Sequence, residues 1–139
     1  MHLEELGEAV VGCTRRVDFV KGEYLLRVGA PAEECFLIER GLVALEAHAP
    51  ARPAEVIATL GAGDLVGLSW ILPPYRWAYD ARAMQPVHAT AIDARRVRER
   101  CEADPRVGYH LLQGLLRATI DRLQAMRLRH LDVYRGPAP

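Results

Sequence analysis

The chain has 139 residues, enough for one domain with a hydrophobic core that needs no disulfide or metal to hold it together. Lysine and arginine together number 18, as do aspartate and glutamate, which excludes the overall basic field that draws a protein onto nucleic acid or an anionic membrane. The three cysteines, Cys13, Cys35 and Cys101, are odd in number and form no CxxC pair, a pattern that favours reduced thiols in a cytoplasmic protein and gives no metal site.

The N-terminal stretch MHLEELGEAVVGC carries acidic residues and no long apolar run. A signal peptide has a basic start followed by an apolar stretch, and a membrane helix needs about 20 apolar residues. We therefore expect a cytoplasmic protein with no membrane contact. Within an N-terminal segment 1–16, Leu3, Leu6, Val10 and Val11 recur at the spacing of one helix face, which predicts a short amphipathic helix over residues 2–13.

Residues 17–92 have a different pattern, because short apolar runs alternate with breaks rich in glycine and proline. The runs are EYLLRV, CFLIE, LVALEA, EVIATL and VHATAI. Glycine supplies positive φ and proline ends strand pairing, so the breaks are expected to form turns. Several short strands at regular spacing predict a β-sandwich or a barrel.

Helical periodicity returns in residues 93–135. Asp93 predicts the cap of a short helix through ARRVRERCEA. Asp104 followed by Pro105 predicts the start of a second helix that continues to about Tyr134, because an acidic cap and a proline at the first helical position favour a helix start. Glycine and prolines in the tail, residues 136–139, are expected to end it.

The long helix carries apolar residues in two lines. A heptad-like seam consists of two series of residues seven apart, offset by four: Leu112, Thr119, Met126 and Val133, and Leu116, Leu123 and His130. A second line lies partly on other faces: Leu111, Leu115, Leu128 and Leu131. The seam predicts a parallel homodimer, with the second line touching the helix's own domain. The alternative is that the helix only covers its own β-domain, as an ordinary amphipathic helix does.

The order of a helix, a strand-rich region, a short helix and a long helix resembles the cyclic nucleotide-binding domain family of catabolite activators and kinase regulatory subunits. The glycine-bearing turns that carry the resemblance are Lys21-Gly22-Glu23, Gly29, Gly41 and the stretch LGAGDLVG at residues 60–67, which is similar to the family's LxPGDxFG motif before its phosphate-binding cassette. The resemblance covers about residues 17–134. It implies a mainly β fold, a double-stranded β-helix or jelly-roll with flanking helices, and cyclic AMP, cyclic GMP or another small anion as ligand.

The cassette-like segment, residues 61–83, departs from the family at its two ligand-binding side chains. In the family, backbone N–H groups and an arginine hold the cyclic phosphate, and a glutamate accepts from the ribose 2′-hydroxyl. The resemblance assigns the cassette positions of this chain to Gly67, Leu68, Ser69, Arg76, Trp77 and Ala78. Leu68 stands at the glutamate position and Trp77 at the arginine position. Two lost hydrogen bonds to charged groups remove about 3–6 kcal/mol, or about two to four decades of affinity.

Two arginines are candidates to replace the missing cation. Arg76 reaches the phosphate-binding position if the alignment shifts by one residue, and Arg82 can reach that position from the strand after the cassette. Both can equally be surface residues. Asp80 can form an ion pair with Arg76 or Arg82, and the paired arginine would then be unable to bind a ligand.

Aromatic residues are concentrated in the same segment: Trp70, Tyr75, Trp77 and Tyr79. One interpretation is that the rings plug the pocket and pack the roll. The other is that they stack on a base or another planar ligand. In the family the long helix closes the base end of the pocket, which makes Thr119 and Arg122 candidate lid residues. Thr119 can alternatively belong to the seam, and Arg122 can be exposed.

No Walker loop, GxSxG, HExxH or paired-carboxylate site appears, so the sequence predicts no enzyme. His88 and His110 are expected to be packed or surface residues. Family transcription factors continue into a separate DNA-binding module, for which this chain leaves no room, so we expect no DNA binding by this chain alone. The preferred function is a regulatory sensor that acts through a homodimer or a protein partner. The alternative is a ligand-free adaptor whose pocket is plugged by aromatic side chains.

Overall fold

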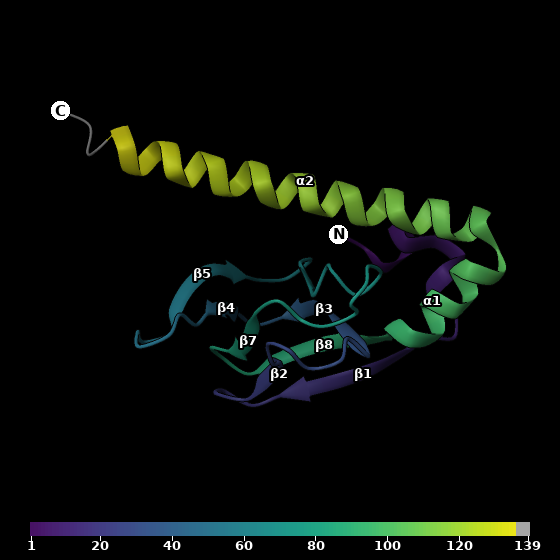
Figure 1. Ribbon diagram of the computed structural model, residues 1–139, viewed down its shortest axis with the longest axis horizontal. Helices are drawn as coiled ribbons and strands as arrows, with labels where there is room; N and C mark the ends of the chain where they lie inside the picture. The colour runs from purple at the N-terminus through teal and green to yellow at the C-terminus, as the bar shows by residue number, and fades with distance from the viewer. Residues whose placement is uncertain (136–139) are drawn as a thin grey trace.

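The computed structural model describes residues 1–135, with side chains described as far as residue 127. In chain order the elements are η1 (Leu3–Val10), β1 (Thr14–Phe19), β2 (Tyr24–Leu26), β3 (Glu34–Arg40), β4 (Val43–Ala47), β5 (Glu55–Leu60), β6 (Leu65–Val66), β7 (Asp80–Ala83), β8 (Val87–Asp93), α1 (Ala94–Ala103) and α2 (Pro105–Arg135). Two four-stranded antiparallel sheets, β1-β8-β3-β6 and β2-β7-β4-β5, form the roll, and α2 runs along it (Figure 1). The expected jelly-roll with flanking helices is confirmed.

All five predicted apolar runs lie in strands, as β2, β3, β4, β5 and β8. The strand β1 begins at Thr14, before the predicted start of the β-region, and its sequence TRRVDF is largely polar. It pairs only with β8 at the edge of its sheet and leaves most of its side chains exposed. An edge strand of this kind needs few apolar residues, which is why the hydrophobic pattern did not reveal it.

The N-terminal element differs from the predicted amphipathic helix. It is a 3₁₀ helix that is interrupted at Gly7, where φ is 69°. Leu6 and Val10 are buried as the apolar spacing predicted, whereas Val11 is exposed. The interruption lets the segment follow α2, and Gly114 of α2 allows the close approach, since a Cβ added there would lie 2.7 Å from the carbonyl oxygen of Glu5.

The helices α1 and α2 begin where the sequence predicted. The Asp93 carboxylate accepts from the backbone N–H of Arg96 at 3.1 Å, and Asp104 accepts from that of Arg106 at 3.1 Å. From α1, the Arg98 guanidinium donates to the carbonyl oxygens of Ala32 and Trp70 at 2.7 and 2.8 Å. The short helix thereby ties the cassette segment to the loop before β3.

The long helix presents two different faces in the described part of the chain. Leu111 and Leu115 are buried, and α2 packs against η1 and α1, so within the described residues this apolar line contacts the helix's own domain. The seam residues Leu112, Leu116 and Leu123 are 48%, 60% and 47% exposed. The side chains of Leu128, His130, Leu131 and Val133 and the tail 136–139 lie outside the described residues. None of the described helices is long and apolar enough to cross a bilayer.

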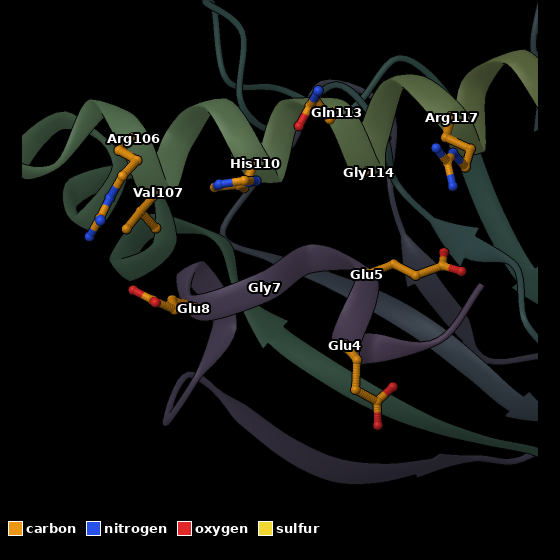
Figure 2. Close-up of a pocket in the computed structure, with 10 residues that line it drawn as sticks. All are labelled: Glu4, Glu5, Gly7, Glu8, Arg106, Val107, His110, Gln113, Gly114 and Arg117. Carbon is orange, nitrogen blue, oxygen red and sulfur yellow. The ribbon is translucent and has the colours of Figure 1, made fainter.

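A groove of about 480 Å³ separates η1 from the start of α2 (Figure 2). Its charged lining residues are Glu4, Glu5 and Glu8 from η1, and Arg106, His110 and Arg117 from α2. All six are exposed, and no ion pair joins the two rows among the described side chains. The groove is therefore a solvated boundary between two helices. His110 is exposed, which is one of the two roles, packed or surface, that the sequence left open for it.

The three cysteines are free thiols. Cys13 and Cys35 are buried and Cys101 is half-buried. Burial raises the pKa of the Cys35 thiol strongly and that of Cys101 to a smaller extent. Both groups are thus held in the unreactive protonated form.

Candidate functional site

A cavity of about 340 Å³ lies between the roll and α2. We call it the roll cavity. Its lining residues are Leu26, Leu45, Ile57, Ala58, Gly67, Leu68, Ser69, Trp77, Ala78, Tyr79, Arg122 and Met126. Strands of the β2-β7-β4-β5 sheet, both ends of the cassette-like segment and α2 all contribute. A cavity of this size with a mostly apolar lining and few polar groups has the character of a small-molecule site.

Trp77 lies against the glycine turn at one end of this cavity. Gly67 has a φ of 95°, and a Cβ added to it would lie 2.6 Å from two carbon atoms of the Trp77 six-membered ring. Trp77 is 5% exposed. In the family resemblance, this turn holds the phosphate. The Trp77 indole fills the space next to the turn, and only a glycine at position 67 leaves room for the ring.

Hydrogen bonds between backbone groups fix Trp77 in this place. Its N–H donates to the carbonyl oxygen of Ala30 at 3.0 Å, and its carbonyl accepts from the N–H of Gly29 at 2.8 Å. Residues 67–79 form turns and one isolated bridge and contain no helix. Trp70 is fully buried elsewhere in the core, and its indole N–H has no partner among the described residues. The second tryptophan thus packs the roll without lining the cavity.

Arg122 is the one charged residue among those that line the roll cavity. Its guanidinium donates to the carbonyl oxygen of Leu65, next to the glycine turn. Burial lowers the pKa of Arg122, and the Asp64 carboxylate opposes that change. An arginine nevertheless stays charged at physiological pH. Thr119, the other candidate lid residue, donates its hydroxyl to the carbonyl oxygen of Leu115 within α2 at 2.8 Å and does not line the cavity.

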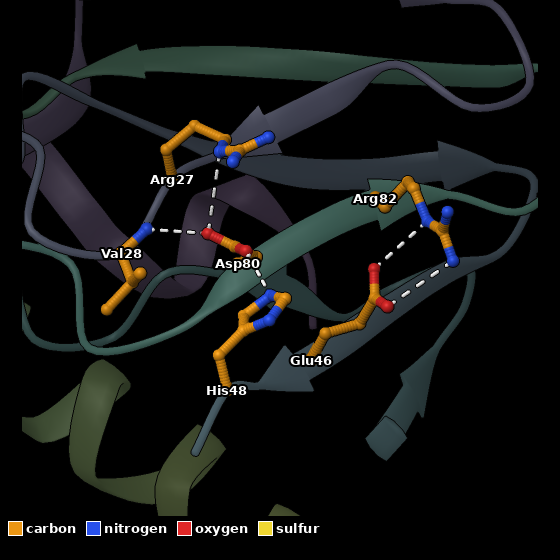
Figure 3. A network of polar contacts seen from close by, with 6 residues as sticks. All are labelled: Arg27, Val28, Glu46, His48, Asp80 and Arg82. Atoms are coloured by element: carbon orange, nitrogen blue, oxygen red, sulfur yellow. Dashed lines mark hydrogen bonds and ion pairs between the residues drawn. The ribbon is translucent and has the colours of Figure 1, made fainter. Parts of the chain in front are cut away.

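The two arginines that the sequence offered as replacements are held elsewhere. The Arg76 guanidinium donates to the carbonyl oxygen of Gly29 at 2.7 Å on the surface. Arg82 forms an ion pair with the buried Glu46 carboxylate at 3.0 Å (Figure 3). Neither residue lines the roll cavity. The cation beside this cavity comes from α2.

Among the described residues, Asp80 pairs with neither Arg76 nor Arg82, the two partners that the sequence left open for it. Asp80 is 1% exposed and accepts from the backbone N–H of Val28 at 2.7 Å. Its carboxylate also lies 2.6 Å from His48 Nε2 and 3.6 Å from Arg27 Nε (Figure 3). These partners lie 52, 32 and 53 positions away along the chain, so only the strand register brings them together.

Residues 16–104 match the family model of the cyclic nucleotide-binding domain, which is well over half of the chain. The chain belongs to the cyclic nucleotide-binding domain family. No curated protein gives a significant match.

Solved structures of the same fold agree. A protein described as cyclic nucleotide-binding from Geobacter metallireducens GS-15 is 24% identical, with a TM-score of 0.75 and 88% of each chain covered. A cyclic nucleotide-binding domain from Methylobacillus flagellatus KT is 18% identical, with a TM-score of 0.76 over 99% of this chain and 76% of that one. The sensor domain of the transcriptional regulator DNR from Pseudomonas aeruginosa is 16% identical, with a TM-score of 0.68 over 89% and 87%. At these identities the likeness shows the fold alone.

Only some of the site residues predicted from the sequence line the same cavity. The roll cavity brings together Gly67, Leu68, Ser69, Trp77, Ala78 and Arg122, and leaves out Arg76, Arg82 and Thr119. Sequence reasoning missed the strand residues Leu26, Leu45, Ile57 and Ala58 and assigned Met126 to the seam alone. Which strand positions face inward depends on register, and the apolar runs do not fix it. Among the described residues, no group of His, Cys, Asp and Glu side chains is arranged to hold a metal ion.

Proposed function

We propose that this chain is a non-catalytic regulatory module that senses a small anionic molecule in the roll cavity and transmits its presence through α2 to a second copy of the chain. The observation that carries the proposal is the division of α2 into two faces. Arg122 lines the cavity, and Leu116 and Leu123 of the seam are exposed. The seam residue Met126 lies where the two faces meet, because it lines the cavity and is 42% exposed. Successive residues of an α-helix lie about 100° apart, so the cavity face and the seam are neighbours on one rigid element.

The lining of the cavity supports a binding role over catalysis. Arg122 is its only charged side chain, and no acid, histidine or cysteine lines it. Ser69 and Tyr79 also line it, but a serine hydroxyl becomes an effective nucleophile only beside a general base. The free thiols support a reducing, cytoplasmic location.

Sedimentation velocity at increasing protein concentration tests the dimer. We expect the sedimentation coefficient to rise to that of a dimer for the wild-type chain, because the exposed leucines follow the seven-residue spacing of a coiled-coil seam. Leu116→Lys should remain a monomer, since it places a charge in that seam. The matched control is Gln124→Lys, which adds the same charge to an exposed position off the seam. A wild-type monomer at all concentrations overturns the homodimer.

Calorimetric titration with cyclic AMP and cyclic GMP tests the altered pocket. Because Trp77 lies at the glycine turn and Leu68 cannot accept from a ribose hydroxyl, we expect affinity about two to four decades below that of a pocket with both family side chains. Saturable micromolar binding would show that the nucleotide displaces the Trp77 ring or finds another phosphate site.

One observation favours a second candidate, a ligand-free adaptor. The contact between Trp77 and Gly67 has the form of a plug. An adaptor would keep the same thermal stability in the presence of any small anion, whereas a sensor gains stability by mass action when it binds one. A thermal-shift series with small anions therefore separates the two candidates.

A further inference from the structure

The end of the roll cavity at the glycine turn has two sources of hydrogen-bond donors. One is Arg122, whose only hydrogen bond within the described part of the chain goes to the carbonyl oxygen of Leu65. A guanidinium has five N–H donors, so most of them have no protein acceptor. The Arg122 guanidinium therefore has free N–H donors at the edge of the cavity.

The second source is the backbone of the turn itself. The N–H groups of Gly67, Leu68 and Ser69 donate to no acceptor among the described residues. Successive free N–H groups beside a residue with positive φ form a small anion-binding concavity. Leu65 is two residues before Gly67, roughly 7 Å along an extended chain. The arginine and the turn thus lie at the same end of the cavity.

Apart from the hydroxyl-bearing residues Ser69 and Tyr79, the rest of the lining is apolar. The side chains of Leu26, Leu45, Ile57, Leu68, Trp77 and Met126 face the cavity, which suits a hydrocarbon or aromatic body. A ribose would bring hydroxyl groups into this lining without a charged acceptor, and an unpaired polar group in an apolar site weakens binding. The cavity therefore combines one anion-binding end with an interior that is mostly apolar.

We infer that the roll cavity binds small apolar monocarboxylates, with the carboxylate held between Arg122 and the turn at residues 67–69 and the apolar body against Trp77, Leu45 and Met126. A carboxylate matches the planar fork of a single guanidinium, and Arg122 is the one cation among the residues that line the cavity. This inference rests on the proposed sensing function, because it names the chemical class that the sensor detects.

Octanoate and 1-octanol are the matched probes, since they share a chain length and differ in charge. The readout is the fluorescence of Trp77 in a Trp70→Phe background, in which Trp77 is the only remaining tryptophan. Trp70 lies outside the cavity and its indole N–H has no partner among the residues that the structure describes, so phenylalanine removes no polar contact with them. We expect octanoate to change the Trp77 emission in a saturable way and to bind at least tenfold more tightly than 1-octanol.

Arg122→Gln should weaken octanoate binding by about tenfold to a hundredfold, the effect of losing one hydrogen-bonded charge, and leave 1-octanol binding unchanged. Arg122→Lys keeps the charge without the fork and should lose less. Arg117→Gln is the matched control, because it removes the same charge from an exposed position of the same helix. Near-ultraviolet circular dichroism checks that each variant is folded.

Three outcomes overturn the inference: octanoate and 1-octanol bind equally, Arg122→Gln and Arg117→Gln behave alike, or micromolar cyclic AMP displaces octanoate. The proposed function fails separately, through sedimentation. If octanoate does not bind but Leu116→Lys still converts a dimer to a monomer, the carboxylate assignment is wrong and the assembly stands. If octanoate binds without changing the association of the wild-type chain, the carboxylate assignment stands and the signalling route through α2 is wrong.

Discussion

At the scale of single residues, Gly67 and Trp77 fit each other in a way that explains the altered cassette. The positive φ of Gly67 forms the turn, and the missing Cβ leaves the space in which two ring carbons of Trp77 lie. An arginine at the Trp77 position would present a mobile charge to the same space. A rigid indole instead occupies it and adds buried apolar area to the core.

Gly67→Ala should destabilise the fold through two separate effects. An L-residue at this φ costs about 1–2 kcal/mol, and the Cβ, 2.6 Å from the Trp77 ring, adds overpacking of about 1–3 kcal/mol. We expect a total loss of about 2–5 kcal/mol in the free energy of unfolding, measured by urea denaturation. In a Trp77→Leu background the overpacking should disappear and leave the backbone strain.

Gly29→Ala is the control for the backbone strain alone. Gly29 has a φ of 83°, and no atom lies within 4 Å of an added Cβ. The expected loss there is about 1–2 kcal/mol. Equal losses for Gly67→Ala and Gly29→Ala would contradict a tight contact between Gly67 and the Trp77 ring.

Two histidine–aspartate pairs with the same 2.6 Å separation differ in burial. The Asp80 side chain, which pairs with His48, is 2% exposed, whereas the Asp18 side chain, which pairs with His88, is 76% exposed. Asp80→Asn should lower the free energy of unfolding by about 1.5–3 kcal/mol, because the buried carboxylate also holds the Val28 N–H. Asp18→Asn should cost less than about 1 kcal/mol. Urea denaturation of both variants gives the comparison, and similar losses would show that Asp80 does not organise the network.

At the scale of elements, the packing of η1 on α2 depends on a glycine inside a helix. Gly114→Ala gains about 1 kcal/mol of helix propensity. Its Cβ, however, meets the carbonyl oxygen of Glu5 at 2.7 Å, and overpacking costs about 1–3 kcal/mol. We expect a net loss of up to about 2 kcal/mol and faster amide hydrogen exchange confined to η1. Gln113→Ala, at the exposed position directly before Gly114, should change neither quantity. A stabilised Gly114→Ala would show that η1 has room to move.

The elements also show what local sequence patterns can predict. The apolar runs of β2, β3, β4, β5 and β8 and the caps Asp93 and Asp104 are local signals, and each was confirmed. The polar edge strand β1 and the interrupted η1 give no such signal, because exposure at the sheet edge and the approach of Gly114 are properties of the assembled fold.

The residues of the candidate site likewise fall into those that local sequence patterns predicted and those that depend on the assembled fold. A motif and its spacing located Gly67, Leu68, Ser69, Trp77 and Ala78, which do line one cavity. The partners of Arg76, Arg82 and Asp80 were not predictable, because an arginine on a strand or loop pairs with whichever acceptor the register brings near. Glu46 and Gly29 lie 36 and 47 positions away from their arginines in the chain.

At the scale of the whole molecule, α2 joins the cavity to the seam, so binding and assembly should be linked. If octanoate changes the dimer dissociation constant by some factor, dimerisation must change the octanoate dissociation constant by the same factor. Arg122 and Leu123 are consecutive residues, one in the cavity lining and one 47% exposed on the seam. A shift of the helix that accommodates octanoate therefore also moves the seam.

The measurement is the octanoate dissociation constant of the dimeric chain and of Leu116→Lys, both in the Trp70→Phe background. We expect the two values to differ by at least about fivefold, the lower end of typical coupling between sites. Gln124→Lys, which keeps the seam intact, should match the dimer. Identical constants for dimer and monomer would mean that the cavity and the seam act independently. In that case a conformational change of α2 is not what carries the signal, because binding would have no differential affinity for the two assembly states.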